Sequence, residues 1–186
     1  MEDARIVRIS RFLSKHLRHQ PQRLGLTLEP GGWVAVDGLL AACASLGMPL
    51  TREELDEVVA RNDKRRFSYD ESGERICANQ GHSVAVDLQL SPITPPAILY
   101  HGTGRAIVDV ILREGLRKMR RHHVHLSADI PTAIKVGRRH GQPVVLAVDA
   151  GAMSADGYAF FRSENGVWLV DAVAPRYLLL LEVSDG

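Results

Sequence analysis

The sequence predicts an α+β protein that is divided into two lobes. Prolines at positions 92, 95 and 96 resist both helix and central strand, so residues 91–97 are predicted to form a linker. Before this segment apolar residues recur at helical spacing, and after it they gather in short runs of strand length. We therefore expect one lobe at residues 1–90 and another at residues 98–186.

The first lobe is predicted to begin with an amphipathic helix at residues 5–18. Ile6, Ile9, Leu13 and Leu17 recur on one helical face. The opposite face carries a row of basic residues at spacings of 3, 4 and 3, namely Arg8, Arg11, Lys15 and Arg18.

Two further helices and a hairpin are expected before the linker. After a short apolar strand at residues 33–36, Asp37 is predicted to cap a helix that runs to residue 46. Thr51 and Glu54 form a capping-box pattern that opens a third helix. Residues 64–69 and 75–78 then have the pattern of a hairpin. Three helices followed by a hairpin is the order of a winged helix.

The second lobe is predicted to be richer in strands. Strand-length apolar runs occur at residues 98–101, 124–126, 144–148, 167–170 and 178–183. Helices are expected at residues 105–113 and 131–139, the latter with a proline in its first turn.

Composition excludes several classes of protein. With 23 Lys and Arg against 22 Asp and Glu, the chain lacks the bulk positive charge of a histone-like binder. Residues 1–23, however, carry six basic residues and two acids, which suits a protein that grips a few phosphates at one place. No apolar run reaches the length of a membrane span, and no signal peptide is recognisable. Cys43 and Cys77 are expected to be reduced and buried in a cytoplasmic protein.

The motifs of several enzyme classes are also absent. The sequence has no GxxxxGK[ST] phosphate loop, no GxGxxG after a strand and no GxSxG nucleophile elbow. Histidines at positions 122, 123, 125 and 140 invite a zinc hypothesis. Neither CxxC nor HExxH accompanies them and their surroundings are basic, so we expect no metal.

Six segments, taken in order along the chain, resemble the tRNA 2′-phosphotransferase family. In the first lobe they are Leu13-Ser14-Lys15-His16-Leu17-Arg18-His19, Asp63-Lys64-Arg65-Arg66-Phe67 and Ala78-Asn79-Gln80-Gly81-His82-Ser83. In the second lobe they are Leu99-Tyr100-His101-Gly102-Thr103, the stretch at residues 115–127, and Ser163-Glu164-Asn165-Gly166-Val167-Trp168-Leu169. Each segment alone is a weak match, but six in family order are specific.

This resemblance implies an N-terminal winged-helix lobe for RNA and a C-terminal ADP-ribosyltransferase-like lobe with a split mixed β-sheet for NAD. It also implies the reaction. The internal 2′-phosphate of an RNA attacks the nicotinamide ribose of NAD and expels nicotinamide, which gives a 2′-phospho-ADP-ribosylated RNA. The ribose 2″-hydroxyl then attacks the phosphate and releases 2′-hydroxyl RNA and ADP-ribose 1″,2″-cyclic phosphate. A monomeric enzyme that consumes NAD without a metal is expected.

The resemblance also carries over site residues. The family's catalytic group corresponds to Arg18, His19, Arg66 and Arg121, and its NAD-lobe histidines to His101 and His125. Further candidates are Lys64 for the substrate phosphate and Gly102, Thr103 and Ser127 for NAD. The residue types suit these roles, because arginine meets phosphate oxygens bidentately and keeps its proton, and histidine transfers protons near neutral pH.

Other interpretations stay open at this point. Protein-modifying ADP-ribosyltransferases place a glutamate near the position of Gly166 or Val167, and this chain has no acid at either. That absence speaks against protein modification and fits a nucleophile that is already ionised. The remaining alternatives are an ADP-ribosyltransferase that caps nucleic-acid phosphates and a winged-helix nucleic-acid binder without catalysis.

Overall fold

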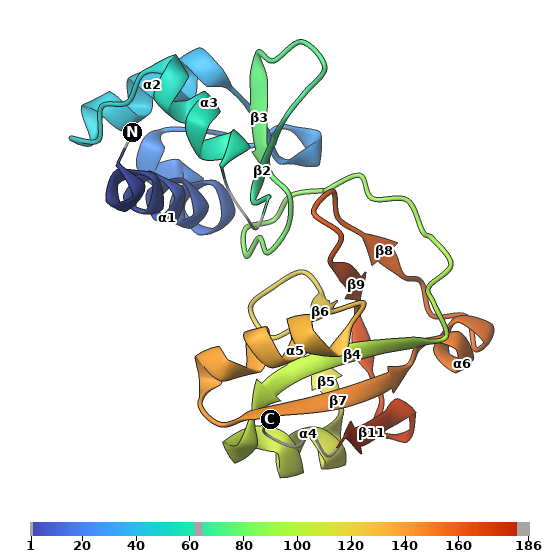
Figure 1. Cartoon of the computed structure of the whole chain (residues 1–186). Coiled ribbons are helices and arrows are strands. Elements are labelled where there is room, and N and C mark those ends of the chain that lie inside the picture. Colours follow the sequence, from blue (N-terminus) through green and yellow to red (C-terminus); the bar gives the residue numbers. More distant parts are fainter. Residues whose placement is uncertain (1, 62–64, 182–186) are drawn as a thin grey trace. The chain divides into compact units, whose positions relative to one another are not determined.

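The computed structural model describes residues 2–61 and 65–181 and divides the chain into two compact units, Met1–Leu90 (unit 1) and Ser91–Gly186 (unit 2). Both units combine helices with small antiparallel sheets, so the protein is α+β as predicted (Figure 1). Each unit has its own hydrophobic core.

Unit 1 begins with the helices. They are α1 (Asp3–His19), α2 (Val36–Ser45) and α3 (Arg52–Ala60), with short 3-10 turns η1 (Pro21–Leu24) and η2 (Pro30–Gly32). The apolar face of α1 is buried at Ile6, Ile9, Leu13 and Leu17, which confirms the predicted amphipathic helix. The capping box of α3 is also confirmed, since Thr51 Oγ1 accepts from the Glu54 N–H and the Glu54 carboxylate accepts from the Thr51 N–H.

The prediction that Asp37 caps the second helix is wrong. Strand β1 (Trp33–Ala35) leads directly into α2, whose N-cap position is Ala35 and has no side-chain cap. Val36 is buried as the first helical residue, so burial of this side chain and not a polar cap determines where the helix begins. Asp37 lies in the first turn, where a negative charge still favours the helix dipole.

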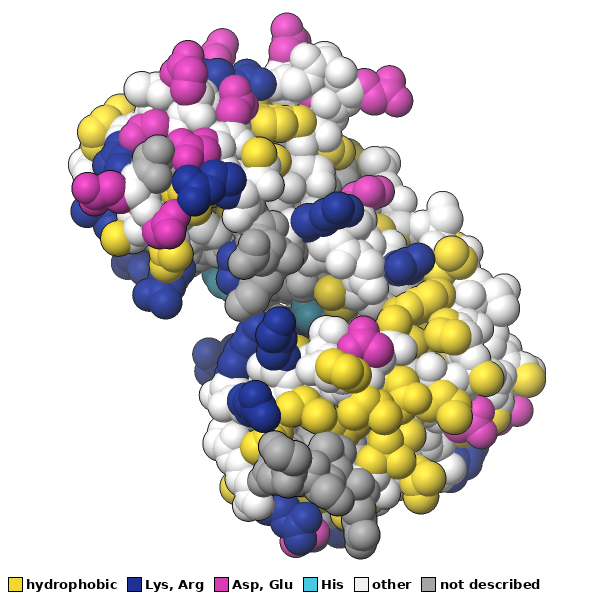
Figure 2. All heavy atoms as spheres, in the orientation of Figure 1, with side chains coloured by type: hydrophobic (Ala, Val, Ile, Leu, Met, Phe, Trp, Pro, Cys, Tyr) yellow, Lys and Arg dark blue, Asp and Glu magenta, His cyan; other side chains and the backbone are white. Residues whose placement is uncertain are grey.

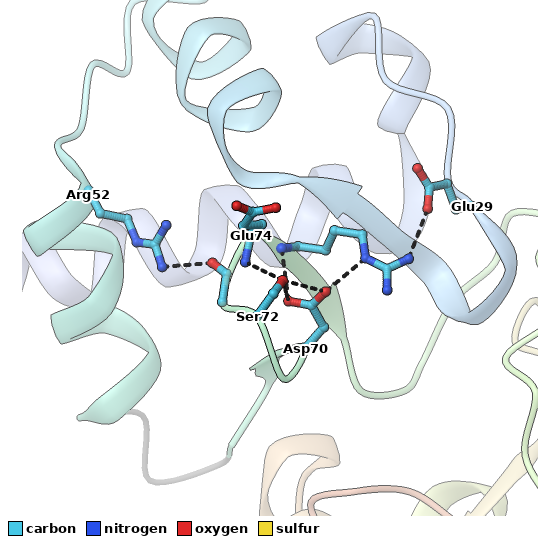
Figure 3. A network of polar contacts seen from close by, with 7 residues as sticks. Glu29, Arg52, Asp70, Ser72 and Glu74 are labelled. Atoms are coloured by element: carbon cyan, nitrogen blue, oxygen red, sulfur yellow. Dashed lines mark hydrogen bonds and ion pairs between the residues drawn. The ribbon is translucent and has the colours of Figure 1, made fainter.

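Three short strands complete unit 1. β2 (Phe67–Tyr69) and β3 (Arg75–Ala78) form the predicted hairpin, and β1 pairs with the other edge of β3. Lys64, at the predicted start of this hairpin, lies outside the described residues. The turn is held by Asp70, whose carboxylate accepts from the Arg75 backbone and guanidinium and from Ser72 (Figure 3). The hydrogen bond from the Arg75 guanidinium is the main reason that the pKa of Asp70 is lowered to about 2.

The described residues of unit 2 form three small sheets. The first has the order β11–β7–β4, from β4 (Ile98–Gly104), β7 (Pro143–Asp149) and β11 (Leu178–Leu181). The second has the order β6–β9–β8, from β6 (Val124–Leu126), β9 (Trp168–Val170) and β8 (Phe161–Arg162). β5 (Leu116–Arg117) pairs with β10 (Ala172–Val173). All these pairings are antiparallel, whereas the resemblance implied a mixed sheet.

Helices α4 (Val108–Glu114), α5 (Ile130–Gly137) and α6 (Ala150–Ala155) surround the strands of unit 2 together with short turns η3 (Arg105–Ile107), η4 (Arg138–His140) and η5 (Pro175–Tyr177). Pro131 lies in the first turn of α5, as predicted. Helix α6 was not predicted, and Asp149 caps it by accepting from the Ala152 N–H.

The proline-rich segment 91–97 contains neither helix nor strand. It belongs to unit 2 and is hydrogen-bonded to the rest of that unit, because the Ile93 N–H donates to the Phe160 carbonyl and the Ala97 carbonyl accepts from the Gly151 N–H. Cys43 and Cys77 are both buried, as predicted, and burial raises the pKa of Cys43 to about 11. Among the residues that the structure describes, no helix combines the length and apolarity that a bilayer crossing requires.

Candidate active site

In unit 1 the candidate residues Arg18 and His19 occupy the last positions of α1. The helix ends there because Pro21 follows and disfavours helical conformation in the residue before it. Arg18 is half-buried, with its Nε and one terminal nitrogen shielded from solvent, and His19 is exposed. The two side chains therefore stand at the end of a helix whose core-facing side is fixed by packing.

A segment without helix or strand, residues 79–83, fastens the end of α1. The Ser83 N–H donates to the Arg18 carbonyl at 2.9 Å, and the Ser83 hydroxyl is hydrogen-bonded to His19 Nδ1 at 2.8 Å. The first contact holds the backbone and the second orients the imidazole ring.

The same segment holds the residues before β2. Asn79 donates from its side chain to the Arg65 carbonyl at 2.7 Å, and its N–H donates to the Arg66 carbonyl at 2.9 Å. Arg65 has a left-handed backbone with φ +38°, a conformation that costs energy and persists only where surrounding contacts hold it. Arg66 in turn donates to the Ser10 hydroxyl of α1 at 3.3 Å. Residues 79–83 thus position Arg18, His19 and Arg66 together.

In unit 2 the two candidate histidines are linked. His101 of β4 donates from Nδ1 to the His125 carbonyl of β6 at 3.1 Å. Burial lowers the pKa of His101, and the hydrogen bond to the His125 carbonyl opposes this only in part. His101 is therefore neutral at pH 7, with its proton on Nδ1 and an acceptor lone pair on Nε2.

Arg121 lies beside these histidines. Its guanidinium donates to His125 Nδ1 at 3.2 Å, which places the proton of a neutral His125 on Nε2. Arg121 closes a turn in which its N–H donates to the Lys118 carbonyl at 3.0 Å, and Met119 has φ +53°. An ion pair of 2.5 Å between Lys118 and Asp171 fastens that turn to the sheet.

Ser127 is brought to the same place by backbone pairing. Its N–H and carbonyl exchange hydrogen bonds of 2.7 Å and 2.9 Å with Tyr100, the residue before His101. This bridge joins β4 to the end of β6, so that His101, His125, Arg121 and Ser127 form one group within unit 2.

Gly102 and Thr103 follow His101 in β4. A Cβ on Gly102 would stand 1.7 Å from the Ala133 carbonyl oxygen of α5, so glycine is required there for helix α5 to pack on the strand. Thr103 is 2% exposed. The structure thus gives Gly102 a packing reason that sequence reasoning did not supply, and the NAD role of both residues stays a prediction.

The segment before β9 is a tight turn. The Gly166 N–H donates to the Ser163 carbonyl at 2.8 Å, and Gly166 has φ +81°, which favours glycine. The Ser163 hydroxyl donates to Asn165 Oδ1 at 2.6 Å, and Glu164 is exposed. Hydroxyl, amide and backbone groups therefore make up this turn. Within the described part of the chain, His, Cys, Asp and Glu side chains nowhere gather in a group of three that could hold a metal ion.

Comparison with known proteins identifies the family. The family model described as RNA 2′-phosphotransferase, Tpt1 / KptA family, matches residues 4–172. The chain belongs to this family. It is therefore an enzyme of the RNA 2′-phosphotransferase type, and the family uses NAD as co-substrate.

Relatives extend the match over almost the whole chain. A probable RNA 2′-phosphotransferase of Trichormus variabilis is 62% identical over 97% of this chain and 100% of its own length. Proteins with the same description from Nostoc punctiforme and Streptomyces griseus are 60% and 59% identical, over 96% and 97% of this chain and 98% and 99% of their own lengths.

Sequence reasoning missed the roles of Ser83 and Asn79 in this phosphotransferase. Both lie within a segment that carried the resemblance, but neither was given a function. Their partners, His19 and Arg65, are 64 and 14 residues away along the chain, so no local pattern could pair them.

Proposed function

We propose that this chain removes an internal 2′-phosphate from RNA in two steps through a 2′-phospho-ADP-ribosylated RNA. The products are 2′-hydroxyl RNA, nicotinamide and ADP-ribose 1″,2″-cyclic phosphate. Family membership is the observation that carries the reaction, and the two side-chain groups support its division between the units. Unit 1, as a winged-helix lobe, binds the RNA phosphate, and unit 2, as an ADP-ribosyltransferase-like lobe, binds NAD.

The chemistry of unit 2 fits a ribose. His101 is neutral and has Nε2 as an acceptor, which suits the hydroxyl donors of the nicotinamide ribose. We assign His101, His125 and Ser127 to NAD, with Gly102 and Thr103 shaping the strand that carries them. Arg121, which donates to His125, holds the incoming phosphate.

The chemistry of unit 1 fits a phosphomonoester. Arg18 and Arg66 offer guanidinium groups that bind phosphate oxygens and cannot take part as acids, so the nucleophile stays ionised. Lys64 is proposed as a further cation for the same phosphate.

His19 is proposed to move the protons of the second step. When the ribose 2″-hydroxyl attacks phosphorus, it loses a proton, and the RNA 2′-oxygen that leaves must gain one. An imidazole that is oriented by a hydrogen bond between Nδ1 and Ser83 is suited to such a transfer at neutral pH. We expect the enzyme to act as a monomer without metal. Its two cysteines, which no disulfide joins, support a reducing, cytoplasmic location.

The test is to mix the protein with NAD and an oligoribonucleotide that carries one internal 2′-phosphate, and to identify all products. Release of nicotinamide together with the cyclic phosphate and 2′-hydroxyl RNA supports the proposal. An ADP-ribosylated RNA as the final product would identify a phosphate-capping enzyme instead, and RNA binding without nicotinamide release would identify a binder.

A further inference from the structure

Two groups of basic residues in unit 1 differ in their partners. Those in the first group are held by carboxylates: Arg5 by Glu54, Arg52 by Asp56, Arg61 by Glu57 and Asp3, and Arg75 by Asp70 and Glu29. These cations serve the fold of unit 1, because each joins elements or stabilises a helix or turn. Little of their charge is left for a ligand.

The second group is the row Arg8, Arg11 and Lys15 on α1. All three are exposed, on the side of the helix opposite the buried Ile9 and Leu13. Within residues 2–61 and 65–181, no carboxylate forms an ion pair with any of them. Three neighbouring cations without counter-charges repel one another, so the row stabilises nothing in the unit itself.

Acidic residues of unit 1 gather elsewhere. Helix α3 carries Glu53, Glu54, Asp56 and Glu57. Figure 2 shows dark-blue Lys and Arg side chains along the lower left edge of unit 1, where α1 lies in Figure 1, and magenta Asp and Glu side chains mainly above them. In helix-turn-helix proteins the second helix of the motif lies in the major groove of the nucleic acid. If α3 took that role here, its carboxylates would be brought toward phosphates. The charge therefore favours α1 as the surface for a polyanion.

The row also leads to the candidate active site. Arg18 follows Lys15 at the next turn of α1, and His19 is the last residue of the helix. With a rise of about 1.5 Å per residue, Arg8 and Arg18 are about 15 Å apart along the axis. A strand whose 2′-phosphate lies at Arg18 can run along the helix and meet one cation after another.

We propose that Arg8, Arg11 and Lys15 bind the backbone phosphates of the RNA strand that flanks the 2′-phosphate, on one side of it. This inference rests on the proposed function, since it takes the 2′-phosphate to be bound at Arg18. It adds a recognition surface outside the reacting group. The enzyme then distinguishes a long RNA from a short one by affinity and not by chemistry, and the contact is independent of base sequence.

The test compares the triple variant Arg8→Gln, Arg11→Gln, Lys15→Gln with the parent protein on three substrates. One is a dinucleotide with an internal 2′-phosphate, and the others extend it on the 5′ side or on the 3′ side. The kcat/KM for one extended substrate should fall roughly tenfold, as expected when several exposed charge contacts are lost together, while the value for the dinucleotide is unchanged. The slope of log affinity against log salt should become shallower by about 2, because each single-strand phosphate contact contributes about 0.7.

The control is a unit 2 variant with the same change of charge, Lys135→Gln, Arg138→Gln, Arg139→Gln. These three residues are exposed like the α1 row, and the variant should keep the parent's preference for the extended substrate. An equal loss in both variants would show a bulk charge effect, and equal loss on the dinucleotide would place the row in the reaction itself. Either result, or no loss at all, overturns the inference. If the parent acts on none of the substrates, the proposed function fails. The inference about the α1 row is then tested separately, by comparing the affinity of the parent and of the triple variant for the same RNA.

Discussion

Replacing Ser83 with alanine tests whether the loop 79–83 acts on the reaction through His19. The change removes the hydroxyl that is hydrogen-bonded to His19 Nδ1 at 2.8 Å. It keeps the backbone hydrogen bond of 2.9 Å from Ser83 to the Arg18 carbonyl, so the end of α1 stays fastened. The expected consequence is an imidazole that samples several orientations within an intact fold.

The size of the effect follows from that single contact. A hydrogen bond contributes about 0.5–1.5 kcal/mol net, and an exposed one such as this belongs in the lower part of the range. Since about 1.4 kcal/mol corresponds to tenfold in rate, kcat for the second step should fall about twofold to fivefold. The KM for NAD and the thermal midpoint should not change, because Ser83 is an exposed residue of unit 1 and the residues proposed for NAD belong to unit 2.

The assay is a pH profile of single-turnover decay of the 2′-phospho-ADP-ribosylated RNA. Ser83→Ala should shift the part of the pH profile that depends on His19. Ser83→Thr, which keeps a hydroxyl, should restore both the rate and the pH profile. The decisive control is the His19→Ala background, in which adding Ser83→Ala should cost nothing further. If Ser83→Ala slows the reaction by the same factor with and without His19, then Ser83 does not act through that histidine and the reasoning fails.

Other predictions address the remaining candidates. His101→Ala should weaken NAD use while leaving affinity for 2′-phosphorylated RNA unchanged in a binding titration, because His101 lies in unit 2; a large loss of RNA affinity would refute the assignment. Lys64→Ala combined with Arg66→Ala should slow the second step more than the first, since charge then builds on the phosphate oxygens, and the adduct should accumulate on a denaturing gel. An inactive variant without adduct contradicts this division. Activity should survive EDTA, and loss that a divalent ion restores would show a metal requirement. Burial lowers the pKa values of His101 and His123, so the unfolded chain binds more protons below about pH 6.5, and the unfolding free energy should decrease there as pH falls. Urea titrations at several pH values measure this, and replacing both histidines with glutamine should flatten the dependence.

Helix α1 and the capping box of α3 were predictable because their signals are local. The apolar stripe and the Thr51–Glu54 pair are each written within a few residues of sequence, and both occur as expected. Asp37 shows the limit of such signals. An aspartate after an apolar strand is typical of a cap, but the burial of Val36 starts the helix earlier.

Strand β4 shows how tertiary packing overrides local propensity. The apolar run predicted this strand only over residues 98–101. It continues through Gly104 because residues 102–104 pair with β7, in the register Gly102 with Val145 and Thr103 with Val144. The missing Cβ of Gly102 then lets α5 approach the strand. Those contacts come from residues 31 to 43 positions away, which periodicity does not record.

The candidate residues came from motifs, but the contacts that give them a chemical state came from the fold. The sequence places His101 after an apolar run and cannot say which of its nitrogens carries the proton. The His125 carbonyl decides this by accepting from Nδ1, and burial keeps the ring neutral. Likewise, nothing near residue 19 in the sequence indicates that Ser83 orients its ring.

The two groups of side chains differ in a way that the proposed reaction requires. A phosphate that attacks carbon must arrive ionised, so its binding groups should be cations that never give up a proton, and Arg18, Arg66 and Arg121 are such groups. A ribose must instead be held by groups that accept from its hydroxyls without adding positive charge beside a carbon that becomes cation-like. A neutral His101 with an acceptor nitrogen meets that condition, whereas a protonated one would oppose the departure of nicotinamide. Because the nucleophile needs no base, the turn before β9 can dispense with an acid at Gly166 and Val167, and the phosphate itself supplies the negative charge that stabilises the reacting ribose.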